Sequence, residues 1–315
     1  KSIKAPAMRI KEWDYYLITN DSFALALTID DNSYMGLDSF SILDFKAPCE
    51  HTKTVMSIFS NGKLGFPPSS SKGDLIHSGK KHWISFVNQG SVRILKFHAD
   101  DFFSNSPIDG ELTLSCPPAE SMVIVTPFAE NPQAFYYNQK INCMPASGIV
   151  TCNGKKYEFE PTNSFGLLDW GRGVWTYKNT WYWGSASGIV DGATFGFNIG
   201  YGFGDTTAAS ENMIFYNQKC HKLDQITFNI PMKDNEKGKP TEDYMKPWTF
   251  SSNDGRFEMN FVPILDRKSD TNVFLIRSNQ HQVFGLFTGK AVLDDGKVIK
   301  INNFLGFAEK VYNKW

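Results

Sequence analysis

The sequence predicts an all-β protein, built as two tandem antiparallel β-barrels that are related by an internal repeat. Apolar residues recur with a period of two in the stretches 23–29, 257–261 and 283–287, and this period is that of a β-strand. Asn-Gly and Asp-Gly pairs, which are typical of tight hairpin turns, separate such stretches. A helical period of 3.6 residues dominates no long stretch, so many strands with short connections are expected.

The internal repeat joins residues 147–175, SGIVTCNGKKYEFEPTNSFGLLDWGRGVW, with residues 288–315, TGKAVLDDGKVIKINNFLGFAEKVYNKW. Both segments contain two strand-like runs around a tight turn, then a Phe-Gly or Leu-Gly step, an acidic residue and a tryptophan, so that Asp169 matches Glu309. The repeat predicts an N-terminal β-barrel over residues 1–175 and a C-terminal β-barrel over residues 176–315. One continuous sandwich is the alternative architecture. Glu309 lacks the Trp-Gly-Arg that follows Asp169, which favours one working site over two.

Composition and charge exclude several classes of protein. The chain has 315 residues and a formal net charge of −1, and without a basic block no nucleic-acid partner is expected. The apolar runs are too short for a membrane-spanning helix, so no stable membrane insertion is expected. Five scattered cysteines without a Cys-x-x-Cys pair predict reduced, buried thiols and a cytoplasmic protein. The polar segment 232–247 is expected to be a long surface loop.

No cofactor and no metal ion is expected. The sequence has no phosphate-binding loop, dinucleotide fingerprint or nucleophile elbow. The six histidines are dispersed, and the pair that is closest to a functional spacing, His77 and His82, fits no metal-binding pattern. The expected partner is therefore a small-molecule ligand or substrate, and oligomeric state is open.

Aromatic residues point to the binding site. They make up 15% of the chain, and such side chains supply large rigid walls for ligand pockets. Half of the eight tryptophans lie close together in the sequence: Trp170, Trp175, Trp181 and Trp183. We expect them to line a cavity for a small, largely apolar or aromatic molecule near the junction of the two halves.

Residues 195–205 predict a strand with one nearly bare face. Phe195, Phe197, Ile199, Tyr201 and Phe203 point to one side, whereas Asn198 stands among four glycines on the other. Glycines inside a strand indicate either a sharp bend of the barrel or the close approach of a ligand or a tryptophan ring. Tyr201 and Asn198 are therefore candidate ligand-binding residues.

Three charged residues are the candidate catalytic groups: Asp169, Arg172 and Glu211. Asp169-Trp-Gly-Arg172 is expected to form a turn in which the carboxylate pairs with the guanidinium, and a purely structural ion pair is the alternative. Glu211 is expected beside this pair, and two carboxylates with diverging pKa values can divide into general acid and general base. The alternative for Glu211 is a solvent-facing turn residue. Asn212, and a secondary group of Tyr137 and Asn138, complete the predicted ligand contacts.

Four motifs carry a resemblance to known proteins: LLDWGRGVW (167–175), WYWGSASG (181–188), NIGYGFGD (198–205) and SENMIF (210–215). Together with the closing GFAEKVYNKW, they make the chain resemble, over essentially its whole length, the bacterial family called domain of unknown function 2804. The chain is also distantly similar to tandem lipocalin-like proteins, which include carotenoid hydratases, tocopherol cyclases and decalin-forming cyclases. This similarity implies two lipocalin-like β-barrels and a cofactor-free enzyme or carrier for an apolar small molecule. Fold analogy does not identify the substrate.

Three functions follow as hypotheses. The first is a cofactor-independent hydratase, isomerase or cyclase, in which Asp169 or Glu211 transfers a proton and Arg172 holds the partner charge. The second is a protein that binds a lipid or aromatic metabolite without turnover. The third is a carbohydrate-active enzyme, because tryptophan rings stack on sugars and a pair of acidic residues is typical of glycoside hydrolases.

Overall fold

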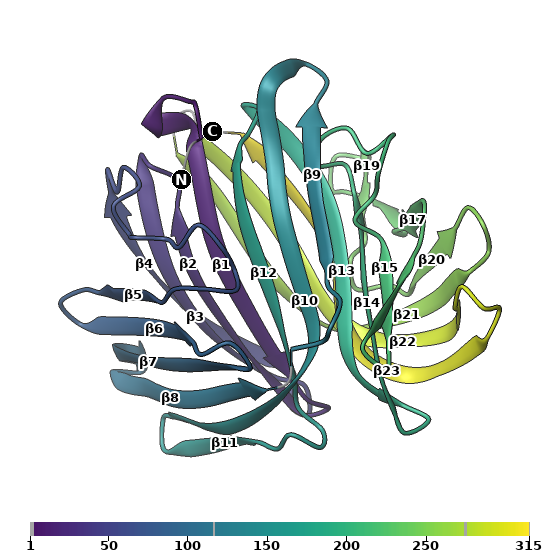
Figure 1. Cartoon of the computed structure of the whole chain (residues 1–315), viewed down its shortest axis with the longest axis horizontal. Coiled ribbons are helices and arrows are strands. Elements are labelled where there is room, and N and C mark those ends of the chain that lie inside the picture. The colour runs from purple at the N-terminus through teal and green to yellow at the C-terminus, as the bar shows by residue number, and fades with distance from the viewer. Residues whose placement is uncertain (1–2, 116, 274–275, 315) are drawn as a thin grey trace. The chain divides into compact units, whose positions relative to one another are not determined.

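A computed structural model of the chain describes residues 3–115, 117–273 and 276–314. Among these residues the one helical element is a short 3-10 helix, η1 (Ala7–Arg9), and all other regular structure is β-strand (Figure 1). The sheets are antiparallel throughout their described pairings. The described part of the chain contains no helix with the length and apolar character needed to cross a membrane.

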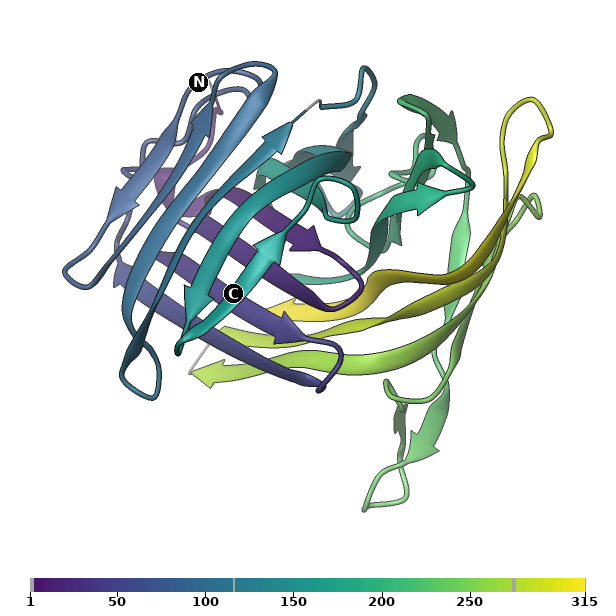
Figure 2. The same ribbon diagram turned by 90° about the horizontal axis from the view of Figure 1, so that it is seen from below.

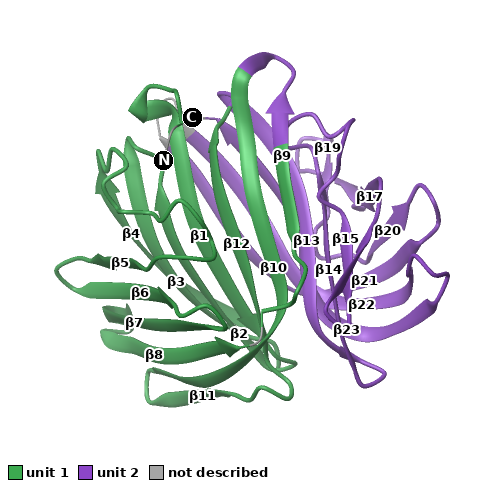
Figure 3. Cartoon of the chain, viewed as in Figure 1, with its two compact units in different colours: residues 1–125, 133–175 green, residues 126–132, 176–315 purple. Residues whose placement is uncertain are grey.

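The chain divides into two compact units (Figure 3). The first comprises residues 1–125 and 133–175, and the second comprises residues 126–132 and 176–315. Residues 126–132 form the tip of a hairpin whose remaining residues belong to the first unit. Within the second unit this tip packs on the segment after Tyr201: the rings of Phe128 and Phe203 meet edge to face, 5.3 Å apart.

The first unit is built on one strongly curved sheet with the strand order β4-β3-β2-β1-β12-β10-β8-β7-β6-β5, to which β9 and β11 add by pairing with β10. Its strands are β1 (Ile10–Thr19), β2 (Phe23–Asp31), β3 (Met35–Asp44), β4 (Cys49–Ile58), β5 (Leu75–Ser78), β6 (His82–Asn88), β7 (Val92–Phe103), β8 (Ser106–Ser115), β9 (Met122–Phe128), β10 (Asn131–Cys152), β11 (Lys155–Phe159) and β12 (Phe165–Val174).

The two limbs of this sheet face each other across an apolar core. Phe40 on β3 packs against Phe97 on β7, with ring centroids 6.0 Å apart, and Tyr16 on β1 packs against Phe86 on β6, 4.7 Å apart. In Figure 1 the limb β5–β8 crosses the limb β1–β4 at a steep angle. This curvature is how an antiparallel sheet buries one face without a second layer.

The second unit is built on a nine-stranded sheet with the order β16-β15-β14-β13-β23-β22-β21-β20-β17, and β18 pairs separately with β19. The three long strands β21, β22 and β23 curve strongly (Figure 2). The strands are β13 (Lys178–Val190), β14 (Ala193–Tyr201), β15 (Met213–Tyr216), β16 (Lys219–Lys222), β17 (Ile226–Asn229), β18 (Met232–Asp234), β19 (Pro240–Glu242), β20 (Trp248–Ser252), β21 (Phe257–Val273), β22 (Ile276–Val292) and β23 (Val298–Lys314).

The two sheets have the same topology, which confirms the all-β class and the internal repeat. In each unit the first strand is hydrogen-bonded to the second strand on one side and to the last strand on the other: β1 lies between β2 and β12, and β13 lies between β14 and β23. The registers place the repeat mates Asp169 and Glu309 at corresponding positions, opposite Tyr15 on β1 and Trp183 on β13. Two tandem lipocalin-like antiparallel barrels describe this architecture.

Two smaller expectations need correction. The segment 232–247 contains the hairpin β18–β19, with Met232 opposite Glu242, so it is not a plain loop. Of the cysteines in the described ranges, Cys143 and Cys152 are buried as expected, but Cys49 is an exposed thiol. Cys116 lies outside the described residues.

Candidate functional site

Charged residues occupy one end of the inner face of the first unit. Directly opposite residues of antiparallel strands point to the same face, so the register defines rows across the sheet. In one row, Asp14 lies opposite Trp170 and Ile29, and Ile29 lies opposite Asp38. In the row beside it, Glu12 lies opposite Arg172 and Asp31. The next row towards the other end is apolar and aromatic, and contains Leu168, Tyr16, Leu27 and Phe40.

Arg172 is the centre of the charged rows. Its Nη2 lies 3.1 Å from Oδ1 of Asp14, and its Nε lies 3.3 Å from Oε1 of Glu12. Nη1 donates to the backbone oxygen of Trp13 at 2.7 Å. All three charged side chains are buried, with Arg172 only 3% exposed. A buried guanidinium needs such partners, because an unpaired buried charge is costly, and here Glu12 remains beside Arg172 when Asp14 is neutral.

Burial perturbs the protonation of this cluster. It raises the pKa of the Asp14 carboxyl from 3.8 to about 6, although the neighbouring Arg172 guanidinium opposes this by favouring the ionised form. Burial likewise lowers the pKa of Arg172, while Asp14 and Glu12 raise it. A carboxyl group with a pKa near neutrality can both donate and accept a proton under physiological conditions.

Aromatic rings surround the guanidinium. Its central carbon lies 4.3 Å from the ring centroid of Trp170 and 4.6 Å from that of Phe66. Tyr137 meets the Trp170 ring edge to face at 5.3 Å. Within the described residues, the buried Nε1 of Trp170 has no hydrogen-bond partner. This N–H group beside the charged cluster is therefore a donor without an acceptor. Buried donors normally have a partner.

Asp169 lies on the opposite face of the same strand. The sequence predicts a turn in which Asp169 pairs with Arg172, but residues 165–174 form strand β12. Residues three apart in a strand point to opposite faces. Asp169 therefore accepts a hydrogen bond from Nδ2 of Asn138 at 2.5 Å and lies 3.1 Å from Nζ of Lys140. Tyr137 and Asn138 also point to opposite faces of their strand: Tyr137 lies beside Trp170, and Asn138 lies beside Asp169.

Trp175 belongs to the Asp169 face. Its ring meets that of Trp13 edge to face at 5.1 Å, and Trp13 stacks on Tyr136 at 5.8 Å. Gly171 makes this packing possible, because an added Cβ would lie 1.8 Å from Cζ2 of Trp13. The glycine between Asp169 and Arg172 thus admits an aromatic ring instead of forming a turn.

In the second unit, the bare face of 195–205 holds Trp183 and Glu211. Nε1 of Trp183 donates to Oδ1 of Asn198 at 2.6 Å, and Nδ2 of Asn198 donates to the backbone oxygen of Glu211 at 2.8 Å. An added Cβ on Gly200 would lie 2.8 Å from Oε1 of Glu211. The group that approaches Gly200 closely is therefore the Glu211 carboxylate, and Trp183 lies on the same face through its hydrogen bond to Asn198. Glu211 is buried, so it is not a solvent-facing turn residue.

The other predicted residues of the second unit are distributed over both faces of its sheet. Nε1 of Trp181 donates to Glu309 at 2.8 Å. Asn212 accepts a hydrogen bond from the backbone of Gly200 at 2.6 Å, so it fixes backbone. Tyr201 is on the core face, where it stacks on Tyr182 at 4.5 Å. Asp169 and Arg172 both belong to the first unit, but they point to opposite faces of β12, so these two side chains do not share a cavity. Glu211 belongs to the second unit, and its convergence with Asp169 stays a prediction.

Glu12 and Asp14 are the candidate site residues that sequence reasoning missed. The signal was present in the strand Ile10–Thr19, where Glu12, Asp14, Tyr16 and Ile18 alternate onto one face. Two acids on a face that continues as apolar core require a buried cation, and Arg172 is the cation that the register supplies.

The fold and the charged interior define a tandem lipocalin-like barrel protein. Two solved structures share this fold: kievitone hydratase from Nectria haematococca has a TM-score of 0.53 and 12% identity over 96% of this chain and 88% of that chain. An AttH-type protein from Nitrosomonas europaea has a TM-score of 0.55 and 12% identity over 96% of this chain and 92% of that chain. The chain belongs to the family described as domain of unknown function (DUF2804), whose sequence profile matches residues 1–315. No curated protein sequence matches it.

Proposed function

We propose that this protein is an acid–base enzyme of the hydratase, isomerase or cyclase kind, which acts on a small, largely apolar or aromatic molecule inside the first barrel. The observation that carries this proposal is the buried Asp14 carboxyl, with a pKa of about 6, held by Arg172 next to Trp170. Perturbed buried carboxyls with a specific charge partner are typical of catalytic sites. The fold shared with kievitone hydratase supports the same class of reaction by analogy alone.

Asp14 is assigned the proton transfer. In a hydration, its protonated form gives a proton to one carbon of a double bond, water adds to the other carbon, and the Asp14 carboxylate takes back the proton that the water releases. Arg172 keeps its charge and fixes the orientation of the carboxyl. The Trp170 ring stabilises positive charge that develops on the substrate, and its unused Nε1–H is available to a polar group of the substrate.

Asp169 and Glu211 are the candidates of the alternative assignment, in which the proton transfer takes place outside the Arg172 cluster. Asp169 is held by Asn138 and Lys140 on the other face of β12, and Glu211 is held beside Asn198. Trp175, Trp181 and Trp183 remain proposed ligand contacts. A cytoplasmic location remains a proposal too, and the exposed Cys49 thiol supports it, because exposed thiols persist in reducing compartments.

The test begins with native mass spectrometry of the protein purified from its host, which identifies any bound small molecule. Conversion of that molecule is then measured with wild type, Asp14→Asn and Asp169→Asn, the last of which tests the alternative assignment. The proposal predicts that Asp14→Asn lowers turnover by about 100-fold or more while ligand affinity changes little, and that Asp169→Asn is the milder change. If Asp169→Asn abolishes turnover and Asp14→Asn does not, the assignment moves to the other face.

Two other outcomes would support the alternatives. A bound metabolite that is returned unchanged by wild type and Asp14→Asn alike would identify a binding protein. A bound sugar that is hydrolysed, with loss of activity in both Asp169→Asn and Glu211→Gln, would identify a carbohydrate-active enzyme.

A further inference from the structure

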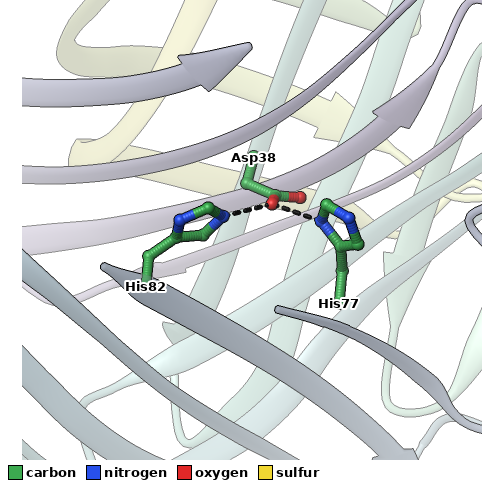
Figure 4. A group of neighbouring side chains, drawn as sticks. All are labelled: Asp38, His77 and His82. Carbon is green, nitrogen blue, oxygen red and sulfur yellow. Dashed lines mark hydrogen bonds and ion pairs between the residues drawn. The ribbon is translucent and has the colours of Figure 1, made fainter. Parts of the chain in front are cut away.

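A second polar group lies on the inner face of the first unit, apart from the Arg172 cluster. Oδ2 of Asp38 lies 2.5 Å from Nδ1 of His77 and 2.7 Å from Nε2 of His82 (Figure 4). One donor atom from each of the three side chains lies within 4.8 Å of the others. Asp38 is 1% exposed and His82 is 7% exposed, whereas the side chain of His77 is 26% exposed. The group is therefore buried but reachable on the side of His77.

The fold brings these residues together from both limbs of the sheet. Asp38 is on β3, and His77 and His82 are on the hairpin β5–β6 that faces it. Gly79 in the hairpin turn leaves room for His82, because an added Cβ would lie 2.2 Å from Cε1 of its ring. Asp38 is in the same row as Asp14, two strands away, which corresponds to roughly 10 Å at the usual strand spacing.

Hydrogen bonding alone leaves this carboxylate incompletely satisfied. Both imidazoles meet the same oxygen, Oδ2, and within the described residues the buried Oδ1 of Asp38 has no hydrogen-bond partner. A buried carboxylate normally satisfies both oxygens. Two imidazole nitrogens and one carboxylate are also a donor set that first-row transition metals prefer.

We propose that Asp38, His77 and His82 bind one divalent first-row transition metal ion, for which Zn²⁺ is the reference probe. Tetrahedral Zn²⁺ with ligands at about 2.0–2.1 Å needs donor atoms roughly 3.3 Å apart, so the carboxylate withdraws slightly from the two imidazoles when the ion enters. The partly exposed His77 provides the entry path. The proposed metal site differs from the expectation from the sequence, because the spacing of the histidines predicts no metal site.

Three protein ligands leave at least one coordination position for water or a ligand atom, as in catalytic rather than structural zinc sites. Asp38, one of the three ligands, is on the sheet face that also presents Asp14. A metal ion at this place would hold an oxygen of a molecule bound in the barrel, or lower the pKa of a bound water. The metal site does not depend on the proton-transfer role of Asp14.

The test measures metal binding directly. The chelator-treated chain without an affinity tag is titrated with Zn²⁺ by calorimetry, and metal content after dialysis is measured by mass spectrometry. One Zn²⁺ per chain is expected. Asp38→Asn, His77→Ala and His82→Ala should each weaken binding by more than the about 10–100-fold that loss of a supporting residue causes. His77→Ala is the variant least disturbing to the fold, because its side chain is partly exposed.

His98→Ala is the matched control. His98 also contacts two carboxylates, Asp109 at 2.7 Å and Asp100 at 2.9 Å, but these carboxylates are 51% and 48% exposed, whereas Asp38 is 1% exposed. The His98→Ala variant should bind Zn²⁺ with the same affinity as wild type. The proposal is overturned if wild type retains no stoichiometric Zn²⁺, if folded His77→Ala and Asp38→Asn bind it unchanged, or if His98→Ala loses it equally. Circular dichroism identifies variants that have not folded.

Discussion

Replacing Asp14 by asparagine should stabilise the protein above neutral pH, even though it removes one partner of a buried ion pair. The side chains of asparagine and protonated aspartate have nearly the same shape, so the two proteins should differ little at low pH. They diverge as the wild-type carboxyl ionises, because burial disfavours that charge.

The magnitude follows from the two pKa values. A folded-state pKa of about 6, against an ordinary value of 3.8, means that the folded protein holds this proton more tightly than the unfolded chain does. The stability that this proton contributes is present below pH 3.8 and is lost as pH rises through about 6. At 1.36 kcal/mol for each pH unit, the loss is about 3 kcal/mol in wild type and absent in Asp14→Asn.

The assay is urea denaturation followed by tryptophan fluorescence at several pH values. The difference in unfolding free energy, variant minus wild type, should rise by most of about 3 kcal/mol between about pH 4 and about pH 8. The other titrating groups are present in both proteins, so their contributions to the unfolding free energy cancel in this difference. Asp44→Asn is the control of opposite sign, since a hydrogen bond from Lys155 lowers the pKa of Asp44, and its variant should lose stability relative to wild type as pH rises.

A flat or falling difference for Asp14→Asn would refute this reasoning. It would mean that the ionised carboxylate gains more from Arg172 than it loses by burial, so that Asp14 stays charged at all working pH values. Asp14 would then be a structural counter-ion. Turnover measured on the same samples should show the complementary loss, because residues with perturbed protonation commonly exchange stability for activity.

Two further substitutions test the packing around the candidate residues. Gly171→Ala should destabilise the first unit by about 1–3 kcal/mol or more, because its new Cβ would overlap the Trp13 ring; thermal unfolding measures this, and an unchanged melting temperature would contradict the packing. Trp183→Phe keeps most of the ring but removes the donor to Asn198, so it should cost about 1–3 kcal/mol. A cost no larger than that of an exposed substitution such as Ile189→Val would show that this hydrogen bond contributes nothing.

Much of the architecture was readable from local pattern. A period of two and the tight turn pairs predict strands and hairpins, and the repeat predicts that Asp169 and Glu309 are equivalent, as the registers show. The bare face of 195–205 predicts a close neighbour, and at Gly200 that neighbour is the Glu211 carboxylate. These predictions succeed because each rests on a pattern within a short stretch of the sequence.

The Asp169–Arg172 pairing failed for a reason that strand geometry explains. Glycines on both sides of Arg172 suggested a turn, but Gly171 and Gly173 instead make room for the rings of Trp13 and Trp175 against a regular strand. Once the segment is a strand, parity alone separates Asp169 from Arg172. The true partners, Glu12 and Asp14, are about 160 residues earlier and adjacent only through the closure of the first strand on the last.

The same pairing of the first strand with the last explains why the charged residues lie together at one end of the inner face of the first unit. Strand β1 lies between β2 and β12, so charges placed at alternate positions of β1 meet those of β12 on one side and of β2 on the other. Two adjacent rows of the inner face contain four acids of β1 to β3 (Glu12, Asp14, Asp31 and Asp38), while the next row is apolar. A barrel interior that is charged at one end and apolar at the other can orient a molecule that has one polar and one apolar end. In the proposed function, the reactive polar group of such a molecule lies against Asp14.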